Sequence, residues 1–363
     1  MPPVVLVVPG RIDARTGGSI YDRRIVEGLR NRGWFVDVLE LDASFPYATT
    51  ASVEQADRAL AAVRTETIAI LDGLALGAMP DLIEREASRL RIVALVHLPL
   101  AATVGLDPDT AARFEQAERR ALLVAERVVV TGHATLPLIA RYELTADRVV
   151  VVEPGTDIAP VARGSGDHRA AGGPDADPPR SLELLSVATV HRGKGHDMLL
   201  TALAAVPCQT WRLTCAGSLT RDPATVEAVR AMTTTLGLED RVSFVGDLDG
   251  PALAACYHAA DVFVLATRQE TYGMAVAEAL ACGLPVVSTM TGAIPDLLGD
   301  GAGLLVPVGD TPALIDALSR VLDDADLRTS LAGSARRVRH RMPTWDESAG
   351  DMAAVLDSLV AHG

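Results

Sequence analysis

Long apolar runs, a basic charge balance and paired cysteines are all missing from this chain of 363 residues. No apolar stretch approaches the roughly 18 residues that a membrane span needs, and the first one, Val4–Val8, stops at Pro9-Gly10. The start of the chain lacks the basic residues and the cleavage site of a signal peptide. A formal net charge of -14 provides no field that would gather nucleic acid or anionic lipid. We therefore expect a cytoplasmic protein that binds no nucleic acid. Membrane association is disfavoured, but the basic run Arg336–Arg341 keeps open a local patch for a membrane or an acceptor.

Cysteine and metal-ligand patterns are also scarce. The four cysteines show no CxxC spacing and sit among apolar or small residues, which favours buried free thiols in a reducing compartment: Cys208, Cys215, Cys256 and Cys282. No cluster of His or Cys has the spacing of a zinc site. A Gly-x-Ser-x-Gly elbow, typical of many hydrolases, does not occur.

The bare Asp-x-Asp spelling, by which some transferases hold Mn or Mg on a diphosphate, occurs in several places, and those considered as candidates are Asp107-x-Asp109, Asp175-x-Asp177 and Asp247-x-Asp249. In an acidic chain this spelling arises often, and all three places suit turns. We interpret them as loop aspartates, and we expect neither a bound metal nor a cofactor.

What the sequence does have is an alternation of short Val/Ile/Leu-rich runs with helix-length amphipathic segments. The predicted strands are Val4–Val8, Phe35–Leu39, Ile68–Leu71, Ile92–Val96, Val128–Val130, Val149–Val152, Leu182–Val187, Trp211–Cys215, Val242–Phe244, Val262–Leu265, Pro285–Ser288 and Gly303–Val306. The later helices are predicted at Lys194–Ala205, Pro223–Leu236, Pro251–Ala259, Tyr272–Cys282, Thr311–Asp323, Asp326–His340 and Trp345–Ala361. Strands that alternate with helices indicate parallel sheets with crossover connections, that is, an α/β fold.

The alternation is interrupted once. Residues 159–180 are rich in Gly, Pro, Asp and Ala and show no periodicity, as expected of a linker or an exposed insertion. We predict one domain over residues 1–158 and a second over residues 181–342, a division that agrees with the usual size of domains. Two open α/β sheets place their carboxyl-end loops where ligands bind, so two facing domains predict a cleft with a phosphate site.

The strongest chemical signal lies between Phe263 and Ser288. Glu270 follows a predicted buried strand, Tyr272-Gly273-Met274 opens a predicted helix, and Glu278 lies within that helix. A helix N-terminus with a glycine that permits close approach can receive a diphosphate through its free amides. Carboxylates on either side can accept hydrogen bonds from sugar hydroxyls.

This segment resembles the retaining glycosyltransferases of family 4, whose fold is GT-B. Their signature is a Glu, seven residues and a second Glu, followed by a segment of the form A-x-A-x-G-x-P-V-V, which corresponds to Glu270, Glu278 and Ala279–Val287. The resemblance implies that Glu270 holds hydroxyls of the donor sugar, that the amides at Tyr272–Met274 lie beside it, and that Glu278 holds the ribose. It also implies two facing Rossmann-like, doubly wound domains with the donor on the second, and a C-terminal helix, residues 343–363, that returns to the first.

A second matching segment is Ser186–Leu200, where a strand ends, a loop carries Arg192 and Lys194, and a helix follows. Cations at such a turn can neutralise charge that builds up on a departing diphosphate. Lys194 aligns with the lysine of the family. Thr189 stands where the family has an arginine, so either Arg192 substitutes for it or Lys194 and backbone amides act alone.

Three further assignments follow from the resemblance. Gly17-Gly18, after the first strand, corresponds to the glycine pair that approaches the donor diphosphate, and Gly246, at the end of Phe244-Val245-Gly246, to the strand end near the nucleotide base. His97 ends the strand Ile92–Val96, is followed by Leu98-Pro99, and corresponds to a histidine aimed at the donor sugar. The catalytic candidates are therefore His97, Lys194 and Glu270.

The resemblance implies transfer of a hexosyl-type sugar from a nucleotide-sugar donor, UDP being favoured over GDP, to a hydroxyl of a small-molecule, lipid or glycan acceptor that the sequence does not identify. Retention without an obvious nucleophile suggests metal-independent, front-face attack. Two alternatives stay open. One is a non-catalytic nucleotide-sugar sensor, which the threonine at position 189 keeps open, and the other is a nucleotide-sugar epimerase, which would need acid/base carboxylates at the sugar ring.

Overall fold

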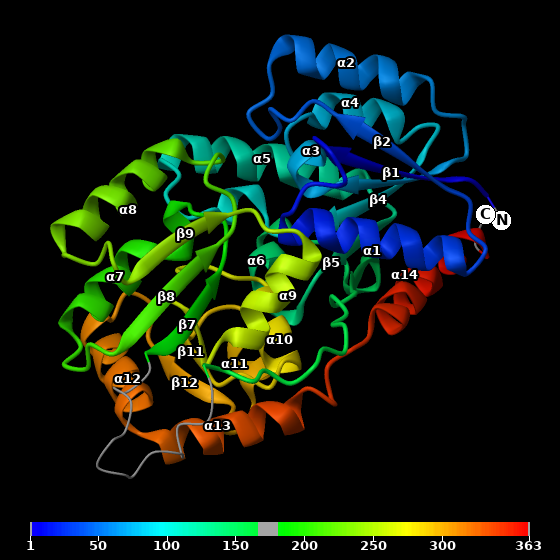
Figure 1. Ribbon diagram of the computed structural model, residues 1–363. Coiled ribbons are helices and arrows are strands. Elements are labelled where there is room, and N and C mark those ends of the chain that lie inside the picture. The colour runs from blue at the N-terminus through cyan, green and yellow to red at the C-terminus, as the bar shows by residue number, and fades with distance from the viewer. Residues whose placement is uncertain (1, 166–180, 362–363) are drawn as a thin grey trace, which may run out of the picture. The chain divides into compact units, whose positions relative to one another are not determined.

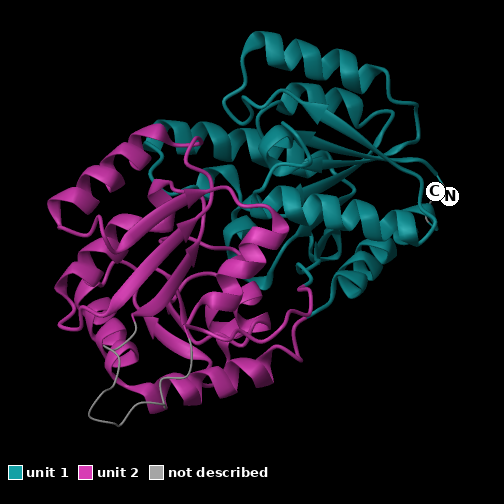
Figure 2. Ribbon diagram, in the orientation of Figure 1, with its two compact units in different colours: residues 1–155, 343–363 teal, residues 156–342 magenta. Residues whose placement is uncertain are grey.

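A computed structural model describes residues 2–165 and 181–361, which fall into two compact units (Figures 1 and 2). Unit 1 comprises Met1–Gly155 together with Pro343–Gly363, and unit 2 comprises Thr156–Met342. Residues 166–180 of the expected linker, which include Asp175-x-Asp177, lie outside the described residues. Within the described part of the chain, no helix combines the length and the apolar character needed to cross a bilayer.

Unit 1 is built on a six-stranded parallel sheet with the order β2-β1-β3-β4-β5-β6. Its strands are β1 (Val4–Pro9), β2 (Val36–Leu41), β3 (Ile68–Asp72), β4 (Arg91–Val96), β5 (Arg127–Val130) and β6 (Val149–Val151). β1 and β3 to β5 are covered on both faces, which explains why they read as continuous apolar runs rather than as alternating ones.

The helices of unit 1 cover both faces of this sheet. They are α1 (Gly17–Asn31), α2 (Thr50–Ala61), α3 (Gly73–Leu76), α4 (Pro80–Glu86), α5 (Pro108–Val124), α6 (Leu136–Ile139) and α14 (Trp345–Val360), with 3-10 turns η1 (Leu100–Ala102), η2 (His133–Thr135), η3 (Ala140–Tyr142) and η4 (Ala146–Arg148). Val5 and Val7 of β1 belong to the core that contains Leu60 of α2. Leu6, on the opposite face, belongs to the core that contains Ile25 of α1. Successive side chains of one strand therefore supply two separate cores.

The last helix, α14, packs on α1 although the two are more than 300 residues apart in the chain. Met352 and Leu356 share a core with α1. The contact is close, because a Cβ placed on Gly28 would stand 2.3 Å from Cβ of Ala349. Arg32 adds a hydrogen bond of 2.6 Å to the carbonyl of Asp346 at the start of α14.

Unit 2 repeats the architecture, with a parallel sheet of order β12-β11-β10-β7-β8-β9. Its strands are β7 (Leu182–Val187), β8 (Trp211–Ala216), β9 (Val242–Gly246), β10 (Val262–Leu265), β11 (Val286–Thr289) and β12 (Gly303–Val306). Its helices are α7 (His196–Ala205), α8 (Pro223–Thr235), α9 (Gly250–Ala259), α10 (Met274–Ala281), α11 (Ile294–Leu298), α12 (Thr311–Asp323) and α13 (Ala325–Val338), with a 3-10 turn η5 (Arg192–Lys194).

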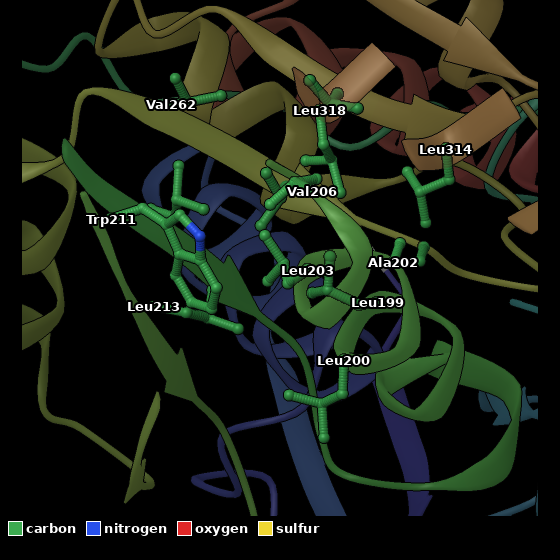
Figure 3. Close-up of a cluster of buried hydrophobic side chains, with 14 of the residues drawn as sticks. Leu199, Leu200, Ala202, Leu203, Val206, Trp211, Leu213, Val262, Leu314 and Leu318 are labelled. Carbon is green, nitrogen blue, oxygen red and sulfur yellow. The ribbon is translucent and has the colours of Figure 1, made fainter. Parts of the chain in front are cut away.

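The larger core of unit 2 lies where α7 meets β8 and α12. Figure 3 shows Leu203 of α7, Trp211 of β8 and Leu318 of α12 among the side chains of this cluster. All three are fully buried or nearly so. Each such side chain contributes about 1.5–3 kcal/mol through the area it removes from water, so this cluster holds α7, and with it the turn that precedes α7, against the sheet.

Several helices begin with an aspartate cap and a proline in the first turn, a combination that satisfies free amides and presets the backbone. Asp107 accepts a hydrogen bond from the amide of Thr110 at 2.9 Å at the start of α5. Asp249 accepts one from the amide of Ala252 at 2.9 Å at the start of α9. The Asp107 and Asp249 carboxylates are therefore helix caps, in agreement with their interpretation as turn residues.

Three expectations need correction. The predicted helix Lys194–Ala205 begins only at His196, because Lys194 belongs to the 3-10 turn η5 and Gly195 adopts φ +66°. The predicted helix Tyr272–Cys282 begins only at Met274, because Gly273 adopts φ +99°, a left-handed conformation outside the helix. All four cysteines are free, as expected, but Cys208 and Cys256 are only partly buried, since the apolar neighbours from which burial was inferred do not enclose them.

Candidate functional site

The site in unit 2 lies at the point where the order of the sheet reverses. β7 is followed along the chain by β8 on one side of it, whereas β10 lies on its other side. In open α/β sheets the loops after two such strands diverge and leave a crevice for ligands. The loop after β7 carries Lys194 and the loop after β10 carries Glu270, so both candidates lie at this switch point.

The turn after β7 is held in a tight conformation. His191 accepts a hydrogen bond at Nδ1 from the amide of Gly193 at 3.1 Å, and Lys194 closes the 3-10 turn. Gly195 follows with φ +66°, and a Cβ there would stand 1.9 Å from the carbonyl oxygen of Ala266. Only glycine fits this position, which brings the turn directly against the end of β10.

The two loops are tied together by Arg268 and Thr267. The amide of Arg268 donates to the carbonyl of Gly193 at 2.7 Å, and the Thr267 hydroxyl donates to the same carbonyl at 3.2 Å. The Arg268 guanidinium makes a bidentate contact of 2.7 and 2.9 Å with Asp197 in the first turn of α7. The position of Lys194 relative to Glu270 is thus set by three neighbouring contacts.

Lys194 and Glu270 form an ion pair in which the ammonium donates a hydrogen bond to Oε1. The side chains are 21% and 13% exposed, so neither charge is fully solvated. Lys194 is also the only lysine in the 363 residues. The one ε-ammonium of the protein therefore lies at the switch point of unit 2.

The start of α10 lies in the same loop as Glu270. Tyr272 is buried, and Gly273 is the residue before the helix. The amides of Val276 and Ala277 donate to the carbonyl of Gly273 at 2.9 and 3.0 Å, which leaves the amides of Met274 and Ala275 as the helix donors that face away from it. An added Cβ on Gly273 would approach Ile294 to 3.1 Å, so the chain is closely packed here. Such an N-terminus is suited to an anion.

Glu278 lies in the second turn of α10. Its Oε2 accepts a hydrogen bond of 2.8 Å from the hydroxyl of Tyr257 in α9. Burial raises the pKa of Glu278 above its ordinary value, the Tyr257 hydroxyl opposes the rise, and the charge of Asp157 adds to it. The Glu278 carboxylate is thus oriented to accept hydrogen bonds in a poorly solvated environment.

The remaining residues predicted in unit 2 lie around this site without a direct bond to it. The Arg192 side chain is exposed, and its carbonyl accepts a hydrogen bond of 2.8 Å from Arg268. Thr189 follows β7 and is partly exposed. Gly246 ends β9 with φ +73°, and its carbonyl accepts a hydrogen bond of 2.9 Å from the amide of Gly217.

A second polar cluster lies at the switch point of unit 1, between β1 and β3. Gly17 and Gly18 open α1, which begins after a cap by Thr16, and a Cβ on Gly18 would stand 3.4 Å from the His97 ring. His97 follows β4, and its Nε2 lies 3.0 Å from Oδ1 of Asp22 in α1 and 3.6 Å from Oδ2 of Asp72 at the end of β3. The structure therefore brings the predicted glycines and histidine together, and it adds two aspartates.

Sequence reasoning missed Asp22, Asp72, Tyr257 and Arg268. Asp72 carried a usable signal, because it directly follows the apolar run Ile68–Leu71, at the carboxyl end of a strand. The single lysine was a second signal, because a residue type that occurs only once in the chain draws attention to position 194. Asp22 and Tyr257 lie within ordinary helices and become visible only through the packing of those helices.

Comparisons with known proteins identify a family and a fold. Residues 181–324 match the family model described as glycosyl transferases group 1. The D-inositol 3-phosphate glycosyltransferase of Salinispora tropica is 33% identical over 262 residues, which are 68% of this chain and 53% of that protein. The enzyme of the same name from Xylanimonas cellulosilytica is 34% identical over 235 residues, 63% of this chain and 55% of that protein. The chain thus spans little more than half the length of these curated relatives.

Solved structures show the same fold over the whole chain. The sucrose-phosphate synthase from Thermosynechococcus elongatus superposes with a TM-score of 0.83 at 22% identity and covers 100% of both chains. Anabaena HepE in complex with UDP and glucose superposes with a TM-score of 0.75 at 17% identity and covers 99% of this chain and 100% of that one. The fold is therefore GT-B, and through residues 181–324 the chain belongs to the glycosyl transferases group 1 family.

Proposed function

We propose that this protein is a glycosyltransferase that moves a hexosyl sugar from a nucleotide-diphosphate sugar to an acceptor hydroxyl, with retention of configuration and without a metal. The observation that carries the proposal is the Lys194–Glu270 pair at the switch point of unit 2, beside the free N-terminus of α10. A cation, a carboxylate and unpaired amides within one loop cluster match the needs of a sugar diphosphate.

In this assignment the diphosphate lies at the start of α10, near Tyr272, Gly273 and Met274. The first amides of the helix donate to its oxygens, and Lys194 exchanges its contact with Glu270 for a phosphate oxygen. This exchange frees Glu270 to accept a hydrogen bond from the sugar. One binding event thereby replaces one ion pair by two interactions with the donor.

The nucleoside occupies the next part of the site. Glu278, held by Tyr257 and poorly solvated, accepts hydrogen bonds from the two ribose hydroxyls. Gly246, at the end of β9, lies beside the base, and Arg192, exposed on the turn after β7, contributes charge to the diphosphate region. We favour UDP over GDP, and the presence of UDP in a solved structure of the same fold supports this order.

The chemistry requires little covalent help from the protein. The acceptor oxygen attacks the anomeric carbon from the face that the diphosphate leaves, the bond between that carbon and the phosphate oxygen breaks, and the acceptor proton passes to the released phosphate. Lys194 and the α10 amides stabilise the negative charge of the leaving group. Glu270 orients hydroxyls of the donor sugar, and His97 of unit 1 binds a substrate hydroxyl.

The acceptor is a hydroxyl compound, and a polyol phosphate is the first to test, because the relatives reported above are named D-inositol 3-phosphate glycosyltransferases. A neutral polyol and a sugar without phosphate provide the comparison. Turnover only with the phosphorylated acceptor would assign a charged acceptor subsite.

The single lysine offers a direct test of donor binding. Protein labelled with ¹⁵N at the lysine ε-nitrogen gives one side-chain ammonium signal, that of Lys194. We expect UDP and UDP-glucose to shift this signal saturably and uridine to leave it in place, because the contact is with the diphosphate. No shift with UDP-, GDP- or ADP-sugars would overturn the assignment of the donor site.

Catalysis is tested separately. Acceptor-dependent release of UDP in the presence of EDTA, with the anomeric configuration of the donor preserved in the product, is the expected result. Binding without release under any acceptor would identify a sensor, whereas loss in EDTA with recovery on addition of Mn²⁺ would contradict metal independence.

A further inference from the structure

His97 stands between two buried carboxylates. Asp22 and Asp72 are 3% and 4% exposed, and both face Nε2 of the imidazole. They come from different elements, Asp22 from α1 and Asp72 from the end of β3, and the topology of the sheet places β1, β3 and β4 side by side. The three ionisable groups are therefore brought together by the fold of unit 1 and are not a chance cluster of surface side chains.

The hydrogen-bond inventory of the cluster is short. The amide of Leu74 donates to Oδ1 of Asp72 at 2.7 Å. Oδ1 of Asp22 lies at 3.0 Å from Nε2 of His97, and an ionised carboxylate can only accept there, so a contact with ionised Asp22 requires a proton on Nε2. Tyr21, whose ring packs edge-on at 5.3 Å, directs its hydroxyl to the carbonyl of Val152 instead. His97, at 22% exposure, is the most accessible of these groups.

We propose that Asp22 and Asp72 are positioning residues that hold a proton on Nε2 of His97 and thereby present Nδ1 to a hydroxyl of a substrate. The proposal rests on the proposed function and deepens it, because it states how the imidazole is oriented and charged. Fixing one ring nitrogen by a carboxylate determines which atom is free for the substrate.

The charges of the cluster agree with this role. Burial alone lowers the pKa of His97, but Asp22 and Asp72 together raise it above its ordinary value. Burial raises the pKa of Asp72 to about 7. The charge of His97 opposes this rise, and the charge of Asp22 adds to it. In its protonated form His97 is matched by these carboxylates beside Nε2. Nδ1–H can then donate to a substrate oxygen without bringing an uncompensated positive charge to it.

The test reads the histidine itself rather than the reaction. The protein labelled with ¹⁵N-histidine is titrated by NMR as wild type, D22N and D72N, with H97Q used to assign the signal among the eight histidines. We expect neutral His97 to carry its proton on Nε2, and we expect D22N to lower its pKa by at least one unit and D72N by less. A neutral wild-type His97 that carries its proton on Nδ1, or an unchanged pKa in D22N, would overturn the proposal.

A matched control is Asp57→Asn, an exposed carboxylate of the same unit that pairs with Arg85, and melting curves verify that each variant is folded. In the transfer assay D22N should reduce kcat at least tenfold with little change in KM, and Asp22→Glu should recover part of the loss. If the wild type transfers no sugar, the proposed function fails while the titration still decides the roles of Asp22 and Asp72.

A bound ion is the competing explanation, since the three ligand atoms lie within 4.8 Å of one another. Zn²⁺ or Mn²⁺ added to protein treated with a chelator should leave the His97 signal unchanged below millimolar concentration. A shift or broadening at micromolar metal that disappears in both D22N and D72N would replace the shared proton by a metal and contradict the proposal.

Discussion

The ammonium of Lys194 and the carboxylate of Glu270 meet across the switch point of unit 2, each at the end of a different parallel strand. The pair is partly buried, so each charge depends on the other for part of its stabilisation. In the proposed reaction the two side chains separate and each binds the donor. The ion pair therefore holds the two groups in place before the donor arrives.

Replacing Lys194 by methionine should separate these two roles. Turnover should fall by about 100-fold or more, because stabilisation of the leaving diphosphate is lost, whereas the donor dissociation constant should change much less. Stability should also fall, by about 1–3 kcal/mol, because the Glu270 carboxylate loses its partner while part of its charge stays solvated. Calorimetry on the donor and single-turnover kinetics measure the two effects.

The double variant K194M/E270Q is the control for the first prediction. It removes both charges and should recover most of the stability while turnover stays low. Recovery of turnover in the double variant would mean that neither charge is needed for transfer and that Lys194 acts only by neutralising Glu270.

Tyr257→Phe should weaken nucleotide binding, although Tyr257 itself does not contact the ligand in the proposed site. The variant removes the hydroxyl that holds Oε2 of Glu278 at 2.8 Å, so the carboxylate loses both orientation and an interaction that lowers its pKa. We expect UDP affinity to fall about tenfold, consistent with a hydrogen bond to a charged group of about 1.5 kcal/mol.

The same variant should show a changed pH dependence. Because burial raises the pKa of Glu278, UDP affinity in the wild type should decline on acidification at a higher pH than for an ordinary glutamate, and in Tyr257→Phe the decline should begin at a still higher pH. Titration calorimetry with UDP at several pH values measures this order. Glu278→Gln, which cannot titrate, should show no such decline.

Asp72→Asn should stabilise unit 1 more at high pH than at low pH. The folded-state pKa of Asp72 is raised from 3.8 to about 7, so between these values the folded protein binds more protons than the unfolded chain and stability falls as the pH rises. The raised pKa of His97 acts with the same sign. Hydrogen exchange on peptides of unit 1 from about pH 5 to about pH 8 measures the difference in stability between the variant and the wild type. A difference that stays the same at every pH would refute the prediction.

Gly28→Ala should destabilise unit 1 by about 1–3 kcal/mol, a typical cost of overpacking. The new methyl group would stand 2.3 Å from Cβ of Ala349, so α14 must shift away from α1. The second change Ala349→Gly removes the obstructing methyl group and should recover most of the loss, apart from the helix propensity of glycine. Thermal melting of the single and double variants completes the cycle, and additive losses would show that the two positions are not in contact.

The strands of both sheets could be predicted from sequence because their apolar runs are short, dense and bounded by turn residues. The predicted strands Leu182–Val187, Val262–Leu265 and Gly303–Val306 agree with β7, β10 and β12 at both ends. Helix starts were less predictable. Gly273 looked like part of a helix, but its left-handed backbone delays the helix to Met274, and this conformation has no sequence signal beyond the glycine itself.

The candidate residues of unit 2 could be found from sequence, but their mutual contact could not. Lys194 and Glu270 are separated by 76 residues and meet only because β10 pairs with β7 rather than with β9. Strand order is a property of the whole sheet. For the same reason Asp22 was overlooked, since a single aspartate within a helix is ordinary until its neighbours in space are known.

The return of α14 to α1 makes unit 2 an insertion within unit 1. The chain leaves unit 1 after Gly155 and re-enters it at Pro343, and a Cβ on Gly155 would stand 2.2 Å from the backbone nitrogen of Trp345, so exit and entry lie at one place. Joining residue 155 to residue 343 by a short linker would keep the strand order of the first sheet and the docking of α14. The two units could therefore be expressed as separate proteins, and neither sheet would have to be cut to create the new chain ends.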